Sequence, residues 1–295
     1  MIISSEFAAS DASRGLRLHR MLCRPESGPV LGRAVVLHGL GDHLGCHRAA
    51  MELLCDRGYV CAGFDAPGHG KSEGRRGHID GVESLFGVIE ETVGRLDAIV
   101  GPVGPRLLYA HSTGAFYALV HLLAISMKQG SISDQTLFDR IWLSSPLLRP
   151  DHGQNRFLIA AAEWLSRLIP GVTLDTGVRP ERCRRLVPGT TPDEVERLCH
   201  CRVSVALGAS LLRHARDADA AAERLRDPAD LLITQGADDT ICPPAYSRAF
   251  FDRVPATRKR YVLLPGTLHE PLREPDNGPI LAAAGRWLDG GDAVA

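Results

Sequence analysis

The chain has 295 residues, of which 44% are apolar and 23% charged, the balance of an ordinary globular protein. Its 34 basic and 35 acidic residues nearly cancel, so no field of one sign favours nucleic acid or an acidic polymer as a partner. The length suits one α/β domain, or one such domain that carries a sizeable insertion.

The chain start has no basic region followed by a long apolar run, so it does not resemble a signal peptide. No stretch reaches the roughly 18 apolar residues of a membrane-spanning helix. We therefore expect a soluble, cytoplasmic protein, and peripheral contact with a membrane stays open. Of the eight cysteines, several lie in apolar stretches and are expected to be buried, reduced thiols. Cys183, Cys199, His200 and Cys201 could form a metal cluster, but they lack the usual C-x₂-C spacing, and we predict no metal.

Short β-branched runs alternate with longer helical patterns along the chain. The predicted strands are Leu16–Cys23, Ala34–His38, Tyr59–Phe64, Arg106–Ala110, Arg140–Leu143, Leu231–Thr234 and Arg260–Leu264. The predicted helices cover about 46–57, 82–99, 113–128, 244–253 and 278–288. This alternation predicts an α/β fold with a mostly parallel central sheet and helices on both faces. Functional groups then gather at the carboxyl ends of the strands.

One segment departs from this alternation of strands and helices. Residues 150–228 contain no clear strand and instead favour short helical pieces joined by Pro/Gly turns. We predict a helical lid at 150–228, inserted in a core formed by residues 1–149 and 229–295.

The nucleophile is predicted at Ser112. Residues 106–115, RLLYAHSTGA, join an apolar strand to a helical run through a turn of small residues. This strand–turn–helix context is typical of a nucleophile elbow, in which a strained turn exposes the serine Oγ. Gly114 satisfies the need for a small residue, and Ala110 stands where a first glycine is usual. His111 is expected to pack in the elbow rather than to react.

A serine nucleophile needs a base, and the base needs an orienting acid. The strand LLITQG is followed by two candidate acids, Asp238 and Asp239. We favour Asp239, three residues after Gly236, because the turn can aim it at a histidine. His269 is the only histidine after Asp239 and follows a further strand, which makes it the predicted base. A zinc motif at HEPLRE is rejected, because the second histidine is absent and Pro271 disfavours the helix.

A glycine-bearing loop follows the strand in AVVLHGLGDH, residues 34–43. Such a loop can point a backbone N–H at a substrate carbonyl. We predict that the amides of Leu40 and Thr113 form the oxyanion hole, with His38 bracing the loop.

These motifs together resemble the monoacylglycerol lipase and lysophospholipase branch of the α/β-hydrolases, over nearly the whole chain. VVLHGLGDH resembles that branch's H-G-x-G-E-H loop, with Asp42 where Glu is common. GYVCAGFDAPGHGKSEGRRGHID resembles its long D-x-x-G-H-G-x-S-x-G-x-R-G-H signature, and AHSTGA, LSSPLL, QGADDTIC and GTLHEPLRE match further blocks. The resemblance implies the α/β-hydrolase fold, the same triad and oxyanion amides, and ester hydrolysis on lipid-like acyl substrates. For Asp65 to His78, we favour a packing role over direct chemistry.

The lid contains an amphipathic helical pattern, NRFLIAAAEWLSRLI, at Asn155–Ile169. Its apolar stripe is expected either to pack on the core or to line an acyl pocket and touch membranes. We assign Phe157, Trp164 and Leu165 to the substrate pocket, together with Asp42 and Cys242. Cys242 is also explained as a small buried residue.

The predicted function is hydrolysis of lipid-like carboxylic esters of monoacylglycerol or lysophospholipid type through an acyl-enzyme on Ser112. The partner is then a small acyl ester or lipid, and neither metal nor organic cofactor is required. Amide or thioester cleavage uses the same attack chemistry and stays open. A non-catalytic hydrolase-like binding protein is disfavoured, because all three triad residues are present. The sequence does not indicate the oligomeric state.

Overall fold

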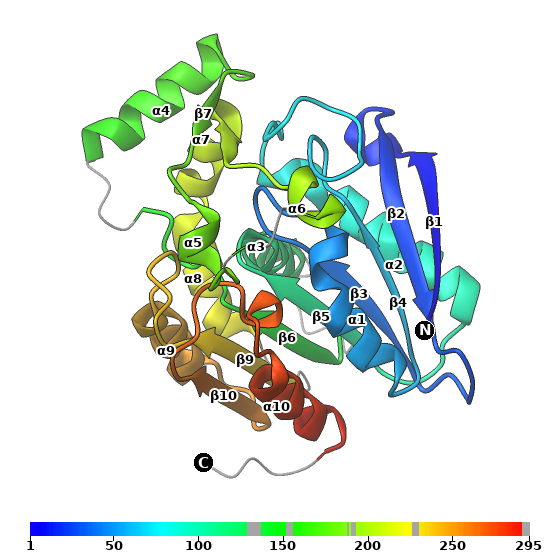
Figure 1. Ribbon diagram of the computed structural model, residues 1–295. Coiled ribbons are helices and arrows are strands. Elements are labelled where there is room, and N and C mark those ends of the chain that lie inside the picture. The colour runs from blue at the N-terminus through cyan, green and yellow to red at the C-terminus, as the bar shows by residue number, and fades with distance from the viewer. Residues whose placement is uncertain (129–136, 152–155, 188, 190–192, 226–229, 291–295) are drawn as a thin grey trace.

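An eight-stranded sheet runs through the centre of the molecule (Figure 1). The computed structural model describes residues 1–128, 137–151, 156–187, 189, 193–225 and 230–290, without the side chains of 128 and 156–160. The strands are β1 (Ile2–Ala9), β2 (Arg17–Arg24), β3 (Gly32–Leu37), β4 (Tyr59–Phe64), β5 (Arg106–His111), β6 (Arg140–Ser144), β9 (Asp230–Gly236) and β10 (Lys259–Leu264). Their order is β1-β2-β4-β3-β5-β6-β9-β10. The six strands from β4 to β10 are parallel, and β1 and β2 are antiparallel to their neighbours.

Helices cover both faces of this sheet, as an all-parallel centre requires. One face packs against α2 (Phe86–Val100), α3 (Thr113–Lys128), α8 (Ala215–Ala220) and α9 (Pro244–Arg253). The other face packs against α1 (Arg48–Cys55) and α10 (Gly278–Leu288). Side chains alternate between the two faces of the sheet. Along β5, Leu108 and Ala110 are buried on the face covered by α2 and α3, whereas Leu107 and Tyr109 are buried on the face covered by α1 and α10. The predicted α/β fold with a mostly parallel sheet is confirmed.

All seven predicted strands are present, but the prediction missed β1. This strand is paired with β2 over its full length, with Ile2 opposite Arg24 and Ala9 opposite Arg17. Almost all of its side chains are exposed. An edge strand with no buried face carries no alternation of apolar and polar residues, so the pattern used to find the other strands is absent there.

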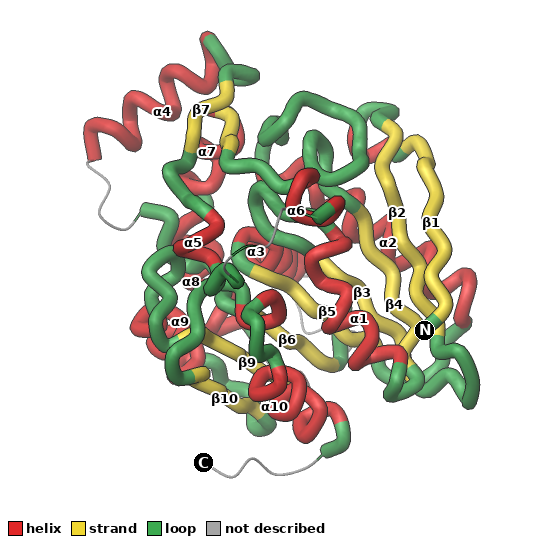
Figure 2. The backbone as a smooth tube through the Cα atoms, viewed as in Figure 1, coloured by secondary structure: helices red, strands yellow, loops and turns green. Residues whose placement is uncertain are grey.

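The segment predicted to be a lid is mostly helical. It contains α4 (Arg156–Leu168), α5 (Pro180–Cys183), α6 (Glu194–Leu198), α7 (Val205–Arg213) and α8. The expectation that it holds no strand is wrong: β7 (Thr173–Asp175) and β8 (Arg202–Ser204) pair antiparallel, with Thr173 opposite Ser204 (Figure 2). Each of these strands has only three residues, which is too few to show an alternation of apolar and polar residues in the sequence.

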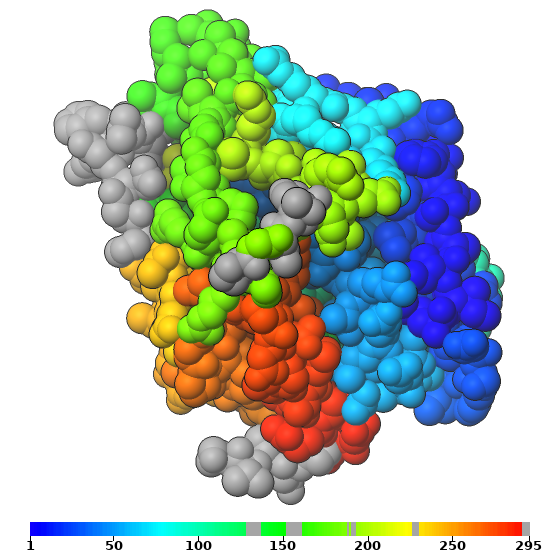
Figure 3. Space-filling view, viewed as in Figure 1, coloured from blue at the N-terminus to red at the C-terminus, as the bar shows by residue number. Residues whose placement is uncertain are grey.

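The end of this segment contributes to the main core. Leu207 and Leu211 of α7 and Ala218 of α8 are buried in the core on the α3 face. The earlier part, from α4 to β8, lies beyond the end of the sheet at which the parallel strands finish (Figure 1), and its green and yellow-green atoms form that side of the surface in Figure 3. Among the described residues, no helix is both long and apolar enough to cross a membrane.

Candidate active site

Ser112 lies in the tight turn between β5 and α3. Its backbone φ is 51°, in the left-handed region that residues with a Cβ rarely adopt. The turn is held by hydrogen bonds from Ser112 N–H to the Ser144 carbonyl at 3.1 Å and from Leu147 N–H to the Ser112 carbonyl at 3.1 Å. A Cβ on Gly114 would lie 2.5 Å from the His38 carbonyl oxygen, so only glycine fits against β3 there. These contacts force the strained backbone that presents the serine.

Three buried side chains form a continuous hydrogen-bonded chain at the carboxyl end of the sheet. Ser112 Oγ lies 2.9 Å from His269 Nε2, and His269 Nδ1 lies 2.8 Å from Asp239 Oδ2. Ser112 follows β5, Asp239 follows β9 and His269 follows β10. Three separate strand ends therefore converge on one point, as the parallel sheet predicts.

The two candidate acids have different surroundings. Asp239 is buried, and its Oδ1 accepts hydrogen bonds from the amides of Ile241 and Cys242, both at 2.8 Å. Asp238 is exposed and lies 3.8 Å from the Arg185 guanidinium. Only Asp239 contacts His269, so the structure brings together the residues that the sequence argument favoured.

The ionisation of His269 depends on opposing effects. Burial lowers the pKa of its imidazole, but Cys242 and the hydrogen-bonded Asp239 carboxylate raise it by more, and the net pKa lies well above the ordinary value. The ring of His111 packs 5.0 Å from that of His269, centroid to centroid. Burial, and then electrostatic interactions with His269 and His47, lower the pKa of His111 well below its usual range. His111 is therefore a neutral packing partner.

The loop after β3 lies directly against the nucleophile. A Cβ on Gly39 would lie 3.1 Å from the Ser112 Cβ. His38 Nδ1 contacts the Gly39 carbonyl at 2.7 Å, and its Nε2 accepts a hydrogen bond from Ala66 N–H at 2.9 Å. Thr113 is the first residue of α3, so its amide has no carbonyl acceptor within the helix. Leu40 follows Gly39 in this loop, and Thr113 follows Ser112 at the start of α3.

A second buried carboxylate, Asp65, organises the glycine-rich loop that follows β4. It contacts His19 Nδ1 at 2.9 Å and accepts the amides of Leu44 at 2.8 Å and Lys71 at 3.0 Å. A Cβ on Gly70 would lie 2.2 Å from Asp65 Oδ2, so the loop must have glycine there. Every described contact of this carboxylate is structural, which agrees with the packing role favoured for this stretch.

The geometry can be compared with known proteins. The family model for "Serine aminopeptidase, S33" matches residues 28–276, most of the chain. The chain belongs to the S33 serine aminopeptidase family. Its fold is that of the α/β-hydrolases, and its relatives lie in their monoacylglycerol lipase-like branch, as the sequence resemblance predicted.

Several relatives of this S33-family chain carry lipase names. A monoacylglycerol lipase of Mycolicibacterium smegmatis is 24% identical, over 93% of each chain. Phospholipase YtpA of Bacillus subtilis is 26% identical over 86% of this chain and 94% of its own. The crystal structure of a Paleococcus ferrophilus monoacylglycerol lipase matches with a TM-score of 0.76 and 30% identity, over 92% of this chain and 98% of that one. Another relative, an abhydrolase domain-containing protein of Dictyostelium discoideum, is much longer, and the match spans 23% of it.

The residues assigned to the substrate pocket of this S33-family chain have different surroundings. Asp42 does not present a free carboxylate, because it binds His47 Nε2 at 2.7 Å and the His43 amide at 2.8 Å. On α4, Trp164 is 61% exposed, Leu165 is half-buried, and the side chain of Phe157 lies outside the described residues. Cys242 is buried, with its Sγ within 4.8 Å of the polar atoms of Asp239 and His269. Burial raises the pKa of this thiol.

Sequence reasoning missed residues that position the acid and the base. Gln235 Nε2 donates to Asp239 Oδ2 at 2.9 Å and to the Cys242 carbonyl at 3.1 Å. The buried Glu274 accepts the amides of Leu268 at 2.9 Å and Arg185 at 3.1 Å, which fixes the loop that carries His269. Gln235 contacts groups within its own turn, and Glu274 joins two separate loops, but neither residue belongs to a motif that would single it out in the sequence.

The cysteines do not form the cluster considered from sequence. In the part of the chain that the structure describes, Cys183 and Cys201 belong to no group of close potential metal ligands, whereas Cys199 lies with His43 and Cys46. The other such group is Asp239, Cys242 and His269, the hydrogen-bonded site itself.

Proposed function

We propose that this protein is a serine hydrolase that cleaves carboxylic esters of lipid-like substrates by acyl transfer. The observation that carries the proposal is the buried chain of hydrogen bonds from Ser112 through His269 to Asp239. In the first step His269 removes the Ser112 proton, and Oγ attacks the ester carbonyl. His269 then protonates the leaving alcohol, and water repeats the sequence on the acyl-enzyme. Asp239 keeps the His269 tautomer in which Nε2 can accept the proton.

The tetrahedral intermediate carries a negative charge that needs hydrogen-bond donors. We assign this role to the amides of Leu40 and Thr113. Thr113 N–H lies at the N-terminus of α3, where the helix dipole favours an anion. The close approach of Gly39, the residue before Leu40, to Ser112 supports the assignment of the Leu40 amide. Removal of one such donor typically lowers kcat by about 10²–10³-fold.

The substrate class rests on relatives and on the lid. Three of the relatives named above are two monoacylglycerol lipases and a phospholipase. In this chain, Trp164 and Leu168 of α4, within the predicted lid, expose large apolar side chains. Such a surface supports an acyl substrate of monoacylglycerol or lysophospholipid type, and transient contact with a lipid surface.

Ser112→Ala tests the chemistry. The variant is expected to lose turnover of p-nitrophenyl esters and labelling by a fluorophosphonate probe. Ser166→Ala is the matched control, because Ser166 is on α4 and its Oγ contacts only the Glu163 carbonyl among described hydrogen bonds. Full activity in Ser112→Ala would refute the assignment. Absence of labelling in the folded wild type would instead favour a non-catalytic hydrolase-like protein.

The second candidate function is amide or thioester cleavage, because the family is described as a serine aminopeptidase family. The same nucleophile and base serve all three bonds, so the geometry does not separate them. A panel of glyceryl monoesters, lysophospholipids, acyl thioesters and aminoacyl arylamides, compared by kcat/KM, decides. We expect the glyceryl or lysophospholipid esters to have the highest value, and a preference for arylamides would overturn the ester assignment.

A further inference from the structure

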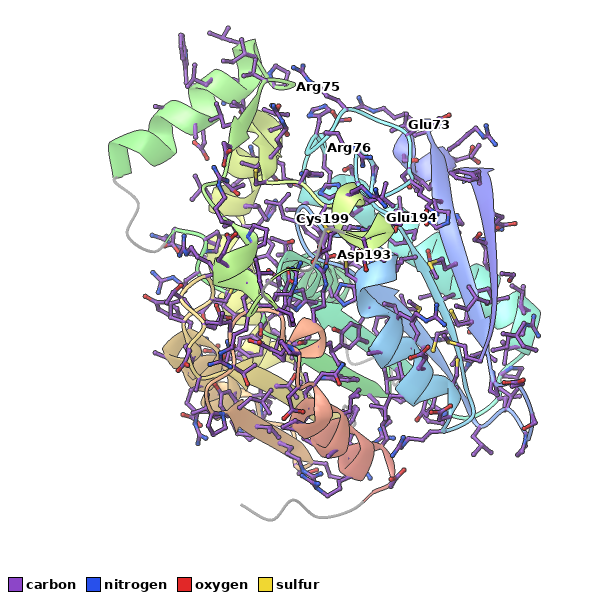
Figure 4. The ribbon with its side chains drawn as sticks, viewed as in Figure 1. Glu73, Arg75, Arg76, Asp193, Glu194 and Cys199 are labelled. Atoms are coloured by element: carbon purple, nitrogen blue, oxygen red, sulfur yellow. The ribbon has the colours of Figure 1, made fainter. Side chains whose placement is uncertain are left out.

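Two thiols meet across the contact between the core and the lid. Cys46 lies in the turn Leu44–His47 before α1. Cys199, which Figure 4 labels, follows the last residue of α6. Their sulfur atoms are 3.6 Å apart. The two residues are 153 positions apart in sequence, so only the docking of α6 on the core brings them together.

Backbone contacts on both sides hold these thiols together. His43 Nε2 donates to the Val195 carbonyl at 2.9 Å, and His200 N–H donates to the Gly41 carbonyl at 2.8 Å. The segment 195–200 thus runs along the loop 41–46 with hydrogen bonds at each end. At Gly41 the approach is so close that a Cβ would lie 1.9 Å from the His200 carbonyl oxygen. The pairing of the two sulfurs is a fixed property of this contact.

Charged groups also tie this part of the lid to the loop that carries His269. Arg184 of the lid binds both Glu196, beside Cys199, and Glu270, the latter at 2.8 Å. Arg273 binds Glu270 at 3.1 Å and places its Nη1 3.9 Å from Cys199 Sγ. A guanidinium beside a sulfur stabilises the thiolate, which is the reactive form of cysteine.

The two thiols differ in their readiness to ionise. The hydrogen bond from the Cys46 thiol, followed by contributions from His43 and Arg273, outweighs burial and lowers the pKa of Cys199 to about 6. The same contact and burial raise the pKa of Cys46 well above its usual value. Cys199 is half-buried and Cys46 is buried. The pair thus combines an accessible thiolate with a protonated partner behind it, the arrangement of an attacking and a resolving cysteine.

His43 completes a group of three potential metal ligands with these sulfurs. Both of its ring nitrogens are already engaged, however: Nε2 by the Val195 carbonyl, and Nδ1 by the Gly45 amide at 3.2 Å. The nearby Arg273 cation further disfavours a metal ion. The surroundings therefore suit thiol chemistry better than metal binding.

We propose that Cys46 and Cys199 form an oxidation site, at which a peroxide converts the two thiols to a disulfide that joins α6 to the loop before α1. The Cys199 thiolate attacks one oxygen of hydrogen peroxide, and the O–O bond breaks to give a sulfenic acid and hydroxide, which takes up a proton as water. Cys46 sulfur then attacks Cys199 sulfur and displaces the second oxygen as water, while the Cys46 proton is released to it. Two thiols are oxidised, one peroxide is reduced, and two waters form. The sulfurs must approach to about 2.05 Å.

The test uses the reduced full-length protein and does not depend on hydrolase activity. Hydrogen peroxide is added, free thiols are blocked with iodoacetamide, and tryptic peptides are analysed by mass. Cleavage at arginine places Cys46 alone in Ala34–Arg48, whereas Leu198–Arg202 contains both Cys199 and Cys201. We expect a cross-link between these peptides, with the loss of two hydrogen atoms, that dithiothreitol reverses.

Matched variants identify which cysteine of the peptide Leu198–Arg202 is bonded to Cys46. Cys201→Ser is expected to retain the cross-link, and Cys199→Ser to abolish it. If Cys199→Ser does not fold, the cross-link in Cys201→Ser by itself assigns the bond, because that peptide then has one cysteine. Recovery of Cys46 as an alkylated thiol after Cys199 has been oxidised would overturn the proposal, as would a cross-link lost in Cys201→Ser.

Discussion

At the scale of single residues, the two neighbouring aspartates give a direct comparison. Asp239→Asn removes the charge that orients and stabilises His269, and we expect kcat to fall by about 10³–10⁴-fold. Asp238→Asn is the adjacent control, because Asp238 is exposed and contacts only Arg185 among described ion pairs. Steady-state kinetics on a p-nitrophenyl ester measure both, and equal losses would contradict the assignment.

The pH dependence also belongs to the residue scale. His269 must be neutral to accept the Ser112 proton, so activity falls as the pH drops below the pKa of His269. Because that pKa is raised above its ordinary value, the acid limb of kcat/KM is expected above pH ~6.5. Its midpoint should move down in Asp239→Asn, where the raising charge is removed. A midpoint that is unchanged by this substitution would show that another group titrates.

Secondary-structure elements position these residues, and the turn between β5 and α3 that carries Ser112 shows this most clearly. Gly114→Ala would place a Cβ 2.5 Å from the His38 carbonyl, and backbone there cannot move cheaply. We expect a loss of about 1–3 kcal/mol in the free energy of unfolding and reduced kcat. Gly94→Ala in α2 is the control, because its Cβ would meet nothing within 4 Å, and it should stabilise the protein by about 0.5–1 kcal/mol. Denaturant unfolding compares the two, and a Gly114→Ala variant as stable as the wild type would contradict the steric argument.

The secondary-structure elements also show how much of the fold and of the site can be predicted from the sequence alone. Strand–helix alternation predicts the parallel sheet, and strand ends predict Ser112 and His269, because these signals are local. β1, β7 and β8 are missed because exposed or three-residue strands have no period. Gln235 and Glu274 are missed because neither residue belongs to a motif that would single it out in the sequence. The buried contact of the Asp42 carboxylate with His47 has no local sequence signal either.

On the scale of the whole molecule, the two ends of the sheet expose comparable leucines. Leu168 on α4 is 60% exposed, and Leu31 before β3, at the opposite end of the sheet, is 56% exposed. If the lid contacts lipid surfaces, Leu168→Ser should weaken sedimentation with phosphatidylcholine vesicles several-fold, whereas Leu31→Ser should not. Each buried CH₂ contributes about 0.8 kcal/mol, so even partial insertion of Leu168 is measurable. Equal binding by both variants would contradict a lid contact.

The distance of 157 residues along the chain between Ser112 and His269 has a consequence for biosynthesis. A growing polypeptide that has emerged through β6 already contains the strained serine turn, but neither its acid nor its base. The C-terminal strands β9 and β10 add to the open edge beside β6 and deliver both partners together. Hydrolytic competence therefore arrives last, so a partly synthesised or truncated chain exposes an inert serine instead of an unregulated esterase.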